Sequence, residues 1–283
     1  MMNTKYKNGR GARKAACYTA LIALTIVFMF PLYWFFLNSL KSYEDIFQFP
    51  PKFWVWPLRF ANYPEAYNYA ALNFGQMLGN SFIITITSVI GAVVSSTIVA
   101  FGFSRLRWRG RDQIFVLVIL TMIIPGEVVL TPLYFIYNRL HLLDTWFPII
   151  APFFFAKPFY TFMIRQSMMG IPVEMDESAV IDGCNVWQRL IYVILPQAKP
   201  ALLAAMIMAM QDQWNNYLEP LIYINSNTKQ TISVGLTFFS GMYNIQWNLV
   251  FAAAVIVALP ILVVFVFLQK YFIQGVVVSG VKG

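Results

Sequence analysis

Long apolar stretches alternate with short polar ones along this chain. A helix needs about 20 apolar residues to cross a bilayer, and six stretches reach roughly that length. They fall at about residues 15–37, 78–103, 114–137, 146–164, 201–224 and 249–268. The pattern predicts an all-α, polytopic membrane protein with six transmembrane helices. Residues 1–14 are expected to form an N-terminal arm, and residues 15–283 a single transmembrane domain.

Prolines occur in five of these stretches, and those in the third and fourth bear most on the fold. Pro125 lies in the third, close to Glu127, and the fourth contains Pro148, Pro152 and Pro158. We expect the fourth span to be irregular, because proline lacks the N–H that a helix interior requires. Irregular backbone at membrane depth is tolerated only inside protein or along a water-filled cavity.

Composition supports the same class. Hydrophobic residues make up 59% of the chain and charged residues only 11%, whereas soluble domains hold roughly 25% charged residues. The net charge of +8 is spread over separate short loops, so it predicts topology rather than a nucleic-acid surface. Cys17 and Cys184 are the only cysteines, which excludes a disulfide scaffold and a cysteine-based metal site.

The first apolar stretch resembles a signal peptide at its start, because residues 1–14 carry five basic side chains and no acid. The stretch is too long for a signal sequence and no small-residue cleavage site follows it, so we expect an uncleaved first helix. Residues 38–77 are rich in proline and aromatic side chains. They are predicted to form a partly ordered loop at the membrane surface.

The distribution of lysine and arginine predicts the orientation. With six spans, 14 of these side chains fall on the side of the two termini and five on the other, while Lys157 lies within a span. Cytoplasmic loops carry the excess of basic residues. Both termini, the arginine-rich loop at 105–111 and the polar loop at about 165–200 are therefore expected in the cytoplasm, and residues 38–77 outside.

One long polar segment, residues 171–200, interrupts the apolar pattern. Its acids follow Pro172, where the positive end of a helix dipole favours them, and Gly183 is a natural stop with positive φ. These signals predict a short helix from Pro172 to Asp182. A second helix is expected at 186–194, ended by Leu195-Pro196 because proline cannot continue the hydrogen-bond ladder.

This segment resembles the EAA loop of the membrane subunits of ABC importers. The family pattern is Glu-Ala-Ala, three residues, glycine, nine residues, then Ile-x-Leu-Pro. The matching residues are Glu177-Ser178-Ala179, Gly183 and Val193-Ile194-Leu195-Pro196, with Ser178 and Val193 as conservative departures. The flanking runs Ile171-Pro172, Ile181-Asp182-Gly183 and Lys199-Pro200-Ala201 are similar to the carbohydrate-importing branch.

The resemblance extends over most of the chain. Residues 214–221 and the C-terminal run 268–283 look like the shorter permease subunit of maltose-type oligosaccharide importers. That likeness implies a multi-pass protein of the bacterial cytoplasmic membrane. It also implies four kinds of partner: a second, different permease subunit, two cytoplasmic ATPase subunits, an extracellular or periplasmic sugar-binding protein, and a sugar or oligosaccharide substrate.

The likeness implies a non-catalytic subunit that binds no cofactor itself. ATP and Mg²⁺ would be used by the partner ATPase, and this sequence has no G-x-x-x-x-G-K-S/T phosphate loop. The residues expected to couple the chain to the ATPase are Glu174, Glu177, Ser178, Ala179, Asp182, Gly183, Leu195 and Pro196. Ser178 and Ala179 are small enough for close approach, and Glu174 and Glu177 share a helix face.

A second set of polar residues lies in apolar stretches. Candidates for the substrate path are Asp212, Asn215, Asn216, Tyr217, Glu219 and Glu127, because ionisable groups within a membrane are costly and usually functional. Asp212 and Glu219 are seven residues apart and would share a face if one helix carried both. The alternatives are pairing with Lys157 or Glu127, or capping of a broken helix.

Two function classes fit these features. The first is a permease subunit that forms half of a sugar pathway and converts ATPase closure into alternating access. The second is a stand-alone transporter or a membrane-bound glycan enzyme, with Asp212 and Glu219 as a carboxylate pair. The EAA-like loop favours the first, and no metal site is expected.

Overall fold

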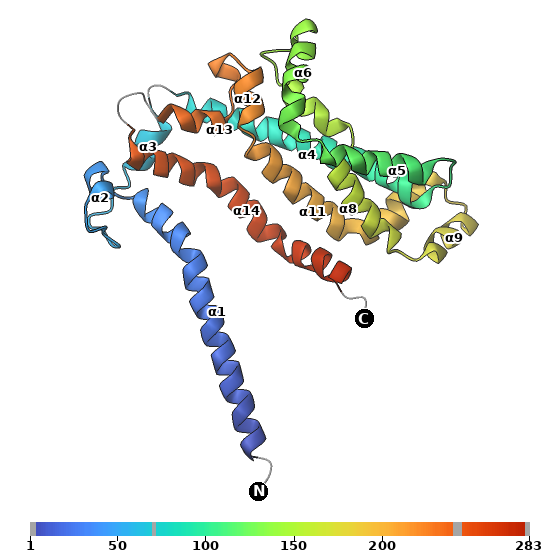
Figure 1. Cartoon of the computed structure of the whole chain (residues 1–283), viewed down its shortest axis with the longest axis horizontal. Coiled ribbons are helices and arrows are strands. Elements are labelled where there is room, and N and C mark those ends of the chain that lie inside the picture. The colour runs from blue at the N-terminus through green and yellow to red at the C-terminus, as the bar shows by residue number, and fades with distance from the viewer. Residues whose placement is uncertain (1–3, 70–71, 240–244, 281–283) are drawn as a thin grey trace. The chain divides into compact units, whose positions relative to one another are not determined.

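The computed structural model describes residues 4–69, 72–239 and 245–280, and their regular structure is helical throughout (Figure 1). Five helical segments are long and apolar enough to cross a membrane. They are Ala16–Asn38, Phe74–Arg105, Phe147–Met169, Val186–Trp214 and Trp247–Phe267. A bent pair of helices gives a sixth if it crosses as one broken span. The predicted all-α membrane fold is confirmed.

The chain divides into two compact units, residues 1–70 with 238–257 and residues 71–237 with 258–283. The first unit contains α1 (Thr4–Asn38), α2 (Tyr43–Phe47), α3 (Asn62–Tyr67) and the start of α14 (Trp247–Gly280). The predicted first span lies within α1, which begins well before it, because the N-terminal arm contains no proline to stop the helix. Residues 1–3 of that arm lie outside the described residues.

Buried polar contacts in this unit join two parts of the predicted surface loop to each other and to the start of α14. The side-chain amide of Asn62 donates to the carbonyl oxygens of Ser39 and Lys41, at 2.9 and 2.8 Å. Asn248 donates to the amide oxygen of Asn62 at 3.0 Å. Buried polar groups need such partners, so this part of the loop is well ordered.

The second unit is built around three helices that lie side by side: α4 (Phe74–Arg105), α8 (Pro158–Met169) and α11 (Leu195–Trp214) (Figure 1). Small buried residues, including Ala92, Ala205 and Ala209, line the contact and allow close approach in lipid. A Cβ atom on Gly91 would lie 2.5 Å from the Phe154 ring, so this position accepts only glycine without a shift. The predicted second span lies within α4.

The third predicted span is wrong as a single helix. α5 (Arg111–Leu120) and the 3-10 turn η1 (Thr121–Ile123) are followed by α6 (Gly126–Arg139), and the two halves are bent by 94°. The break falls at Pro125. The residue before it, Ile124, is extended with ψ of 116°, which is the conformation that a following proline enforces.

The fourth span is irregular, as predicted. It consists of α7 (Phe147–Ile150), the 3-10 turn η2 (Ala151–Phe154) and α8, and Ala156, between η2 and α8, has a φ of 50°.

The fifth predicted span, 201–224, is misplaced. Its helix begins earlier and ends at Trp214, and α12 (Leu218–Tyr223) is a separate element. The sixth lies within α14, whose helix continues to Gly280, while residues 281–283 lie outside the described residues.

Asp144 joins the loop after α6 to the loop after α12. Its carboxylate accepts hydrogen bonds from the backbone N–H of Asn225 and of Ser226, at 3.0 and 2.8 Å. The Ser226 hydroxyl donates at 2.6 Å and the Lys229 ammonium at 3.0 Å. Bonds from Ser226 first, and then from Lys229, hold the pKa of the Asp144 carboxyl well below its usual range. The sequence alone does not distinguish Asp144, since nothing local marks it.

We expect Asp144→Ala to lower the thermal stability of the detergent-solubilised protein by about 1–2 kcal/mol, because several donors lose a charged acceptor at a partly exposed site. Because folding lowers the pKa, the stabilisation is complete above the unfolded value of about 4 and is lost as the pH falls below it. Thermal unfolding at pH 7 and pH 3 measures both effects. The exposed Glu44, changed to alanine, is the control, and equal stability of the two variants at pH 7 would contradict the prediction.

Candidate functional site

The predicted short helix in the polar segment is α9 (Val173–Ile181), with Pro172 before it and Asp182 after it. Gly183 has a φ of +82°. Its N–H bonds to the Val180 carbonyl at 3.0 Å, and the N–H of Cys184 bonds to the Ala179 carbonyl at 2.9 Å. This is the left-handed helix end that glycine favours, so the predicted helix and its stop are confirmed.

The predicted end of the second helix at Leu195-Pro196 is wrong. Asn185 caps α10 (Val186–Gln188) with a reciprocal pair of hydrogen bonds to Gln188. A π-helical segment η3 (Arg189–Ile194) follows and leads directly into α11. A π-turn shifts the hydrogen-bond pairing by one residue. Pro196 therefore falls in the first turn of α11, where a missing N–H is tolerated. The loop predicted at 165–200 is accordingly confined to the segment between α8 and α10.

Most of the predicted coupling residues are exposed, five of them in this loop and Pro196 in the first turn of α11. Glu174, Glu177, Ser178, Asp182, Gly183 and Pro196 are exposed. Ala179 is instead 5% exposed and Leu195 packs against the core cluster. Ala179 therefore does not offer the small outer surface expected of it, because its position on the helix faces its own chain.

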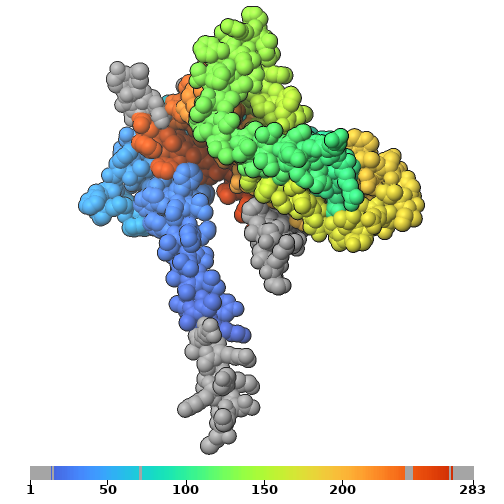
Figure 2. Space-filling model, turned by 45° about the vertical axis from the view of Figure 1, so that its right-hand side comes forward, coloured from blue at the N-terminus to red at the C-terminus, as the bar shows by residue number. Residues whose placement is uncertain are grey.

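Apolar side chains share the exposed face of α9. Val173 is 53% exposed, Val180 54% and Ile181 86%. Figure 1 places α9 at one end of the second unit, and Figure 2 shows the surface of this yellow region uncovered by the rest of that unit. An apolar patch rimmed by acids, next to a polar interruption between two spans, is typical of a protein-docking surface.

The predicted path residues are not on one helix. Asp212 lies near the end of α11, while Glu219 lies in the first turn of α12. Asn215 to Tyr217 form the turn between them, so the expected shared face of a single helix is absent. Asn215 and Tyr217 are exposed and Asn216 is half-buried.

Each of the two acids has its own polar partner. The hydroxyl of Tyr160, a buried residue of α8, donates to the Asp212 carboxylate. The Asn216 amide donates to Glu219 at 2.7 Å, and its oxygen accepts the Glu219 N–H at 3.3 Å. Asn216 thus bonds to the first turn of α12, whose N-cap residue is Tyr217, whereas the capping left open from the sequence was expected of the acids themselves. Tyr160 was not foreseen, because one tyrosine in an irregular apolar span carries no periodic signal.

Neither of the residues considered as partners is in ion-pair contact with these two acids in the described part of the chain. Among the ion pairs of the described residues, none joins Lys157 or Glu127 to Asp212 or Glu219. The Lys157 ammonium lies 4.3 Å from the centre of the Phe153 ring, and Glu127 is exposed in the first turn of α6. No group of three metal-binding side chains occurs in the described part of the chain.

Residues 92–278 match the family described as binding-protein-dependent transport system inner membrane component. Among curated proteins, the arabinooligosaccharides transport system permease protein AraQ of Bacillus subtilis is 31% identical, over 92% of this chain and 92% of its own length. The diacetylchitobiose uptake system permease protein DasC of Streptomyces coelicolor is 29% identical, over 93% and 95%. The lactose transport system permease protein LacG of Rhizobium radiobacter is 26% identical, over 93% and 94%.

The fold also matches a solved structure. A chain of a bacterial ABC transporter involved in the import of the acidic polysaccharide alginate superposes with a TM-score of 0.79. The match covers 93% of this chain and 98% of that one, at 23% sequence identity. At this identity the likeness supports the fold alone.

Proposed function

The chain belongs to the family of binding-protein-dependent transport system inner membrane components, and we propose that it forms half of the membrane pathway of an ATP-driven importer for a sugar or oligosaccharide. The resemblance to ABC importer permeases is thereby confirmed. The names of three relatives, which refer to arabinooligosaccharides, diacetylchitobiose and lactose, support a carbohydrate substrate.

The partners follow from the same proposal. A second, different permease completes the pathway, an extracellular or periplasmic binding protein delivers the sugar, and two ATPase subunits supply energy from ATP and Mg²⁺. The chain itself is non-catalytic. The observation that carries this proposal is the exposed α9, whose acids Glu174 and Glu177 flank an apolar patch beside the left-handed stop at Gly183. Such a surface suits a groove with basic groups at its rim.

Cross-linking tests this proposal. In a chain in which Cys17 and Cys184 are replaced by serine, a cysteine at the exposed Ser178 is expected to cross-link to a co-purifying ATPase subunit. A cysteine at the exposed Asn225, in the loop after α12, is the matched control and should give no such product. A purified chain that transports sugar without ATP would instead favour the stand-alone transporter, and sugar hydrolysis would favour the glycan enzyme.

We propose further that both termini and α9 face the cytoplasm, on the basis of the 14 to 5 distribution of basic residues. Cysteines at Arg109 and at Asn225 should then react with an impermeant maleimide from opposite sides. In right-side-out membranes of the bacterial cell, only the residue 225 cysteine is expected to be labelled. Labelling of the residue 109 cysteine in intact cells would contradict this orientation.

A further inference from the structure

Asp176 differs from the other acids of α9 in facing inward. The residue is 6% exposed, and both of its carboxylate oxygens are shielded from solvent, while Glu174 and Glu177 on the same helix are exposed. A buried carboxylate is costly unless it is paired. Its partners therefore indicate what this residue does.

Two arginines from other elements lie against Asp176. The Nη1 atom of Arg105 is 3.0 Å from Oδ2, and the Nη1 atom of Arg189 is 3.9 Å from Oδ1. Neither contact has the geometry of a hydrogen bond, so both are ion pairs. Arg105 is the last residue of α4, and Arg189 is the first residue of the π-helical segment that leads into α11.

Arg105 also contacts the end of α8. Its Nη2 atom donates to the carbonyl oxygens of Met168 and Ile171, the latter at 2.7 Å. Met168 lies at the end of α8, where its carbonyl also accepts the Ile171 N–H, and Ile171 lies between α8 and α9. The guanidinium thus contacts the end of α8 and neutralises Asp176 at the same time. The three helices at the centre of the second unit, α4, α8 and α11, thus meet at one carboxylate of α9.

We propose that Asp176 is the positioning residue through which a displacement of α9 is transmitted to α4, α8 and α11. The inference rests on the proposed function, in which an ATPase moves α9. Met175 of α9 packs against the apolar core cluster and Ala179 is buried, and apolar contacts are non-directional. The ion pairs resist separation, because moving α9 alone would leave a buried carboxylate and a buried guanidinium unpaired.

The test is Asp176→Asn in the complete importer, reconstituted with its ATPase and binding protein. This change keeps the size of the side chain and the exposed face of α9, so the ATPase should still co-purify and hydrolyse ATP. We expect the sugar imported per ATP hydrolysed to fall about tenfold, which is the range of a typical coupling free energy. Asp176→Glu, which keeps the charge, should restore most of this ratio.

A double substitution separates transmission from general packing. If the ion pairs act as a unit, adding Arg189→Gln to Asp176→Asn should lower the ratio little further. Asp112→Asn is the matched control. Asp112 also lies beside two arginines, Arg111 at 2.9 Å and Arg165 at 3.8 Å, but its side chain is 67% exposed. Asp112→Asn should leave the sugar imported per ATP hydrolysed unchanged, because exposed ion pairs contribute little free energy.

Two results would overturn the inference. One is a normal ratio of import to ATP hydrolysis in Asp176→Asn. The other is a loss of import caused only by a smaller amount of folded complex or of bound ATPase. In that case Asp176→Asn and the milder Arg189→Gln would both import less sugar, but the sugar imported per ATP hydrolysed would be unchanged. Failure of the proposed function is distinguishable from both, because the wild-type chain would then retain no ATPase at all.

Discussion

Gly183→Asp is expected to reduce sugar import more than about tenfold while the protein still inserts in the membrane. The residue is exposed at the end of α9, and a Cβ atom there would meet nothing within 4 Å. The substitution therefore causes no clash within the chain. Backbone strain at its φ of +82° costs on the order of 1 kcal/mol, or about fivefold in an equilibrium. A larger loss requires that the side chain blocks an approaching partner.

Three substitutions separate strain from contact. Asparagine tolerates the left-handed conformation better than alanine does, but it is larger. If the outer surface of Gly183 contacts the ATPase, Gly183→Asn and Gly183→Asp should both lose coupling and Gly183→Ala should lose less. If only backbone strain matters, Gly183→Ala should reduce coupling more than Gly183→Asn does. Import and ATP hydrolysis in proteoliposomes measure the difference.

Gly110 is the matched control for these variants. It has nearly the same φ, +85°, and equally open space around its Cβ position, but it precedes α5 and lies outside α9. Gly110→Asn should leave import close to the wild-type rate. Normal, sugar-stimulated ATP hydrolysis with normal import in Gly183→Asp would remove this loop from the mechanism.

The features that sequence analysis predicted correctly have local causes. α9 is bounded by Pro172 and Gly183, whose backbone preferences act within one turn of the helix. Runs of apolar residues placed most of the spans, because a bilayer imposes a length on any helix that crosses it.

The break at Pro125 has a local cause, but the features that were predicted wrongly in the polar segment and in the fifth span depend on distant contacts. Leu190 and Ile194 are buried in the core and hold the π-helical segment in place. The helix therefore continues through Pro196 into α11. α11 ends at Trp214, a side chain that is only 3% exposed. No proline or glycine within the next few residues indicates that the helix ends there. Asp176 is indistinguishable from Glu174 and Glu177 in the sequence. Only the position of Arg105, at the end of another helix, makes it a buried residue.

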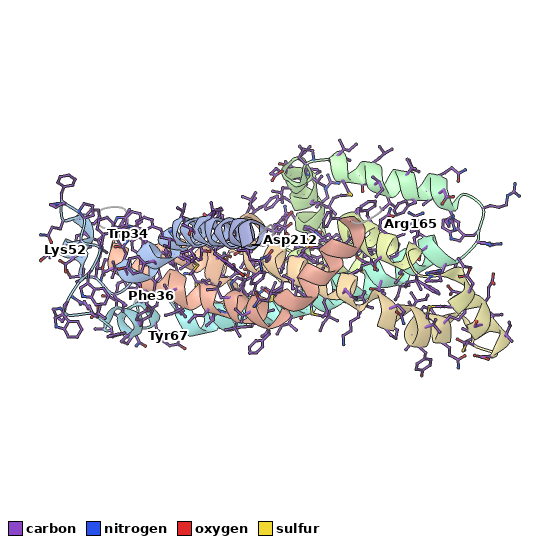
Figure 3. The ribbon with its side chains drawn as sticks, turned by 90° about the horizontal axis from the view of Figure 1, so that it is seen from below. Trp34, Phe36, Lys52, Tyr67, Arg165 and Asp212 are labelled. Carbon is purple, nitrogen blue, oxygen red and sulfur yellow. The ribbon has the colours of Figure 1, made fainter. Side chains whose placement is uncertain are left out.

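The second large effect is expected at Asp212. Its carboxylate is exposed in this chain and is held by the hydroxyl of the buried Tyr160. Figure 3 places it within the second unit, farther from the α9 end than Arg165. A polar group on a membrane-spanning helix must face water or protein. We therefore expect Asp212→Leu to reduce sugar uptake more than about tenfold, while the complex still assembles.

Neighbouring variants test whether this position lines the path. Tyr160→Phe keeps the buried ring and removes only the hydroxyl that orients the carboxylate, so it should reduce uptake less than Asp212→Leu. Asn215→Leu, in the exposed turn after α11, should also impair uptake. Asp144→Ala controls for loss of stability, because it weakens a loop contact elsewhere in the same unit. Each effect is measured as uptake at several sugar concentrations, together with the amount of assembled complex. Since the alternatives for Asp212 are pairing and capping, unchanged uptake in every variant between residues 212 and 219 would assign these residues to the structure of the α11–α12 turn.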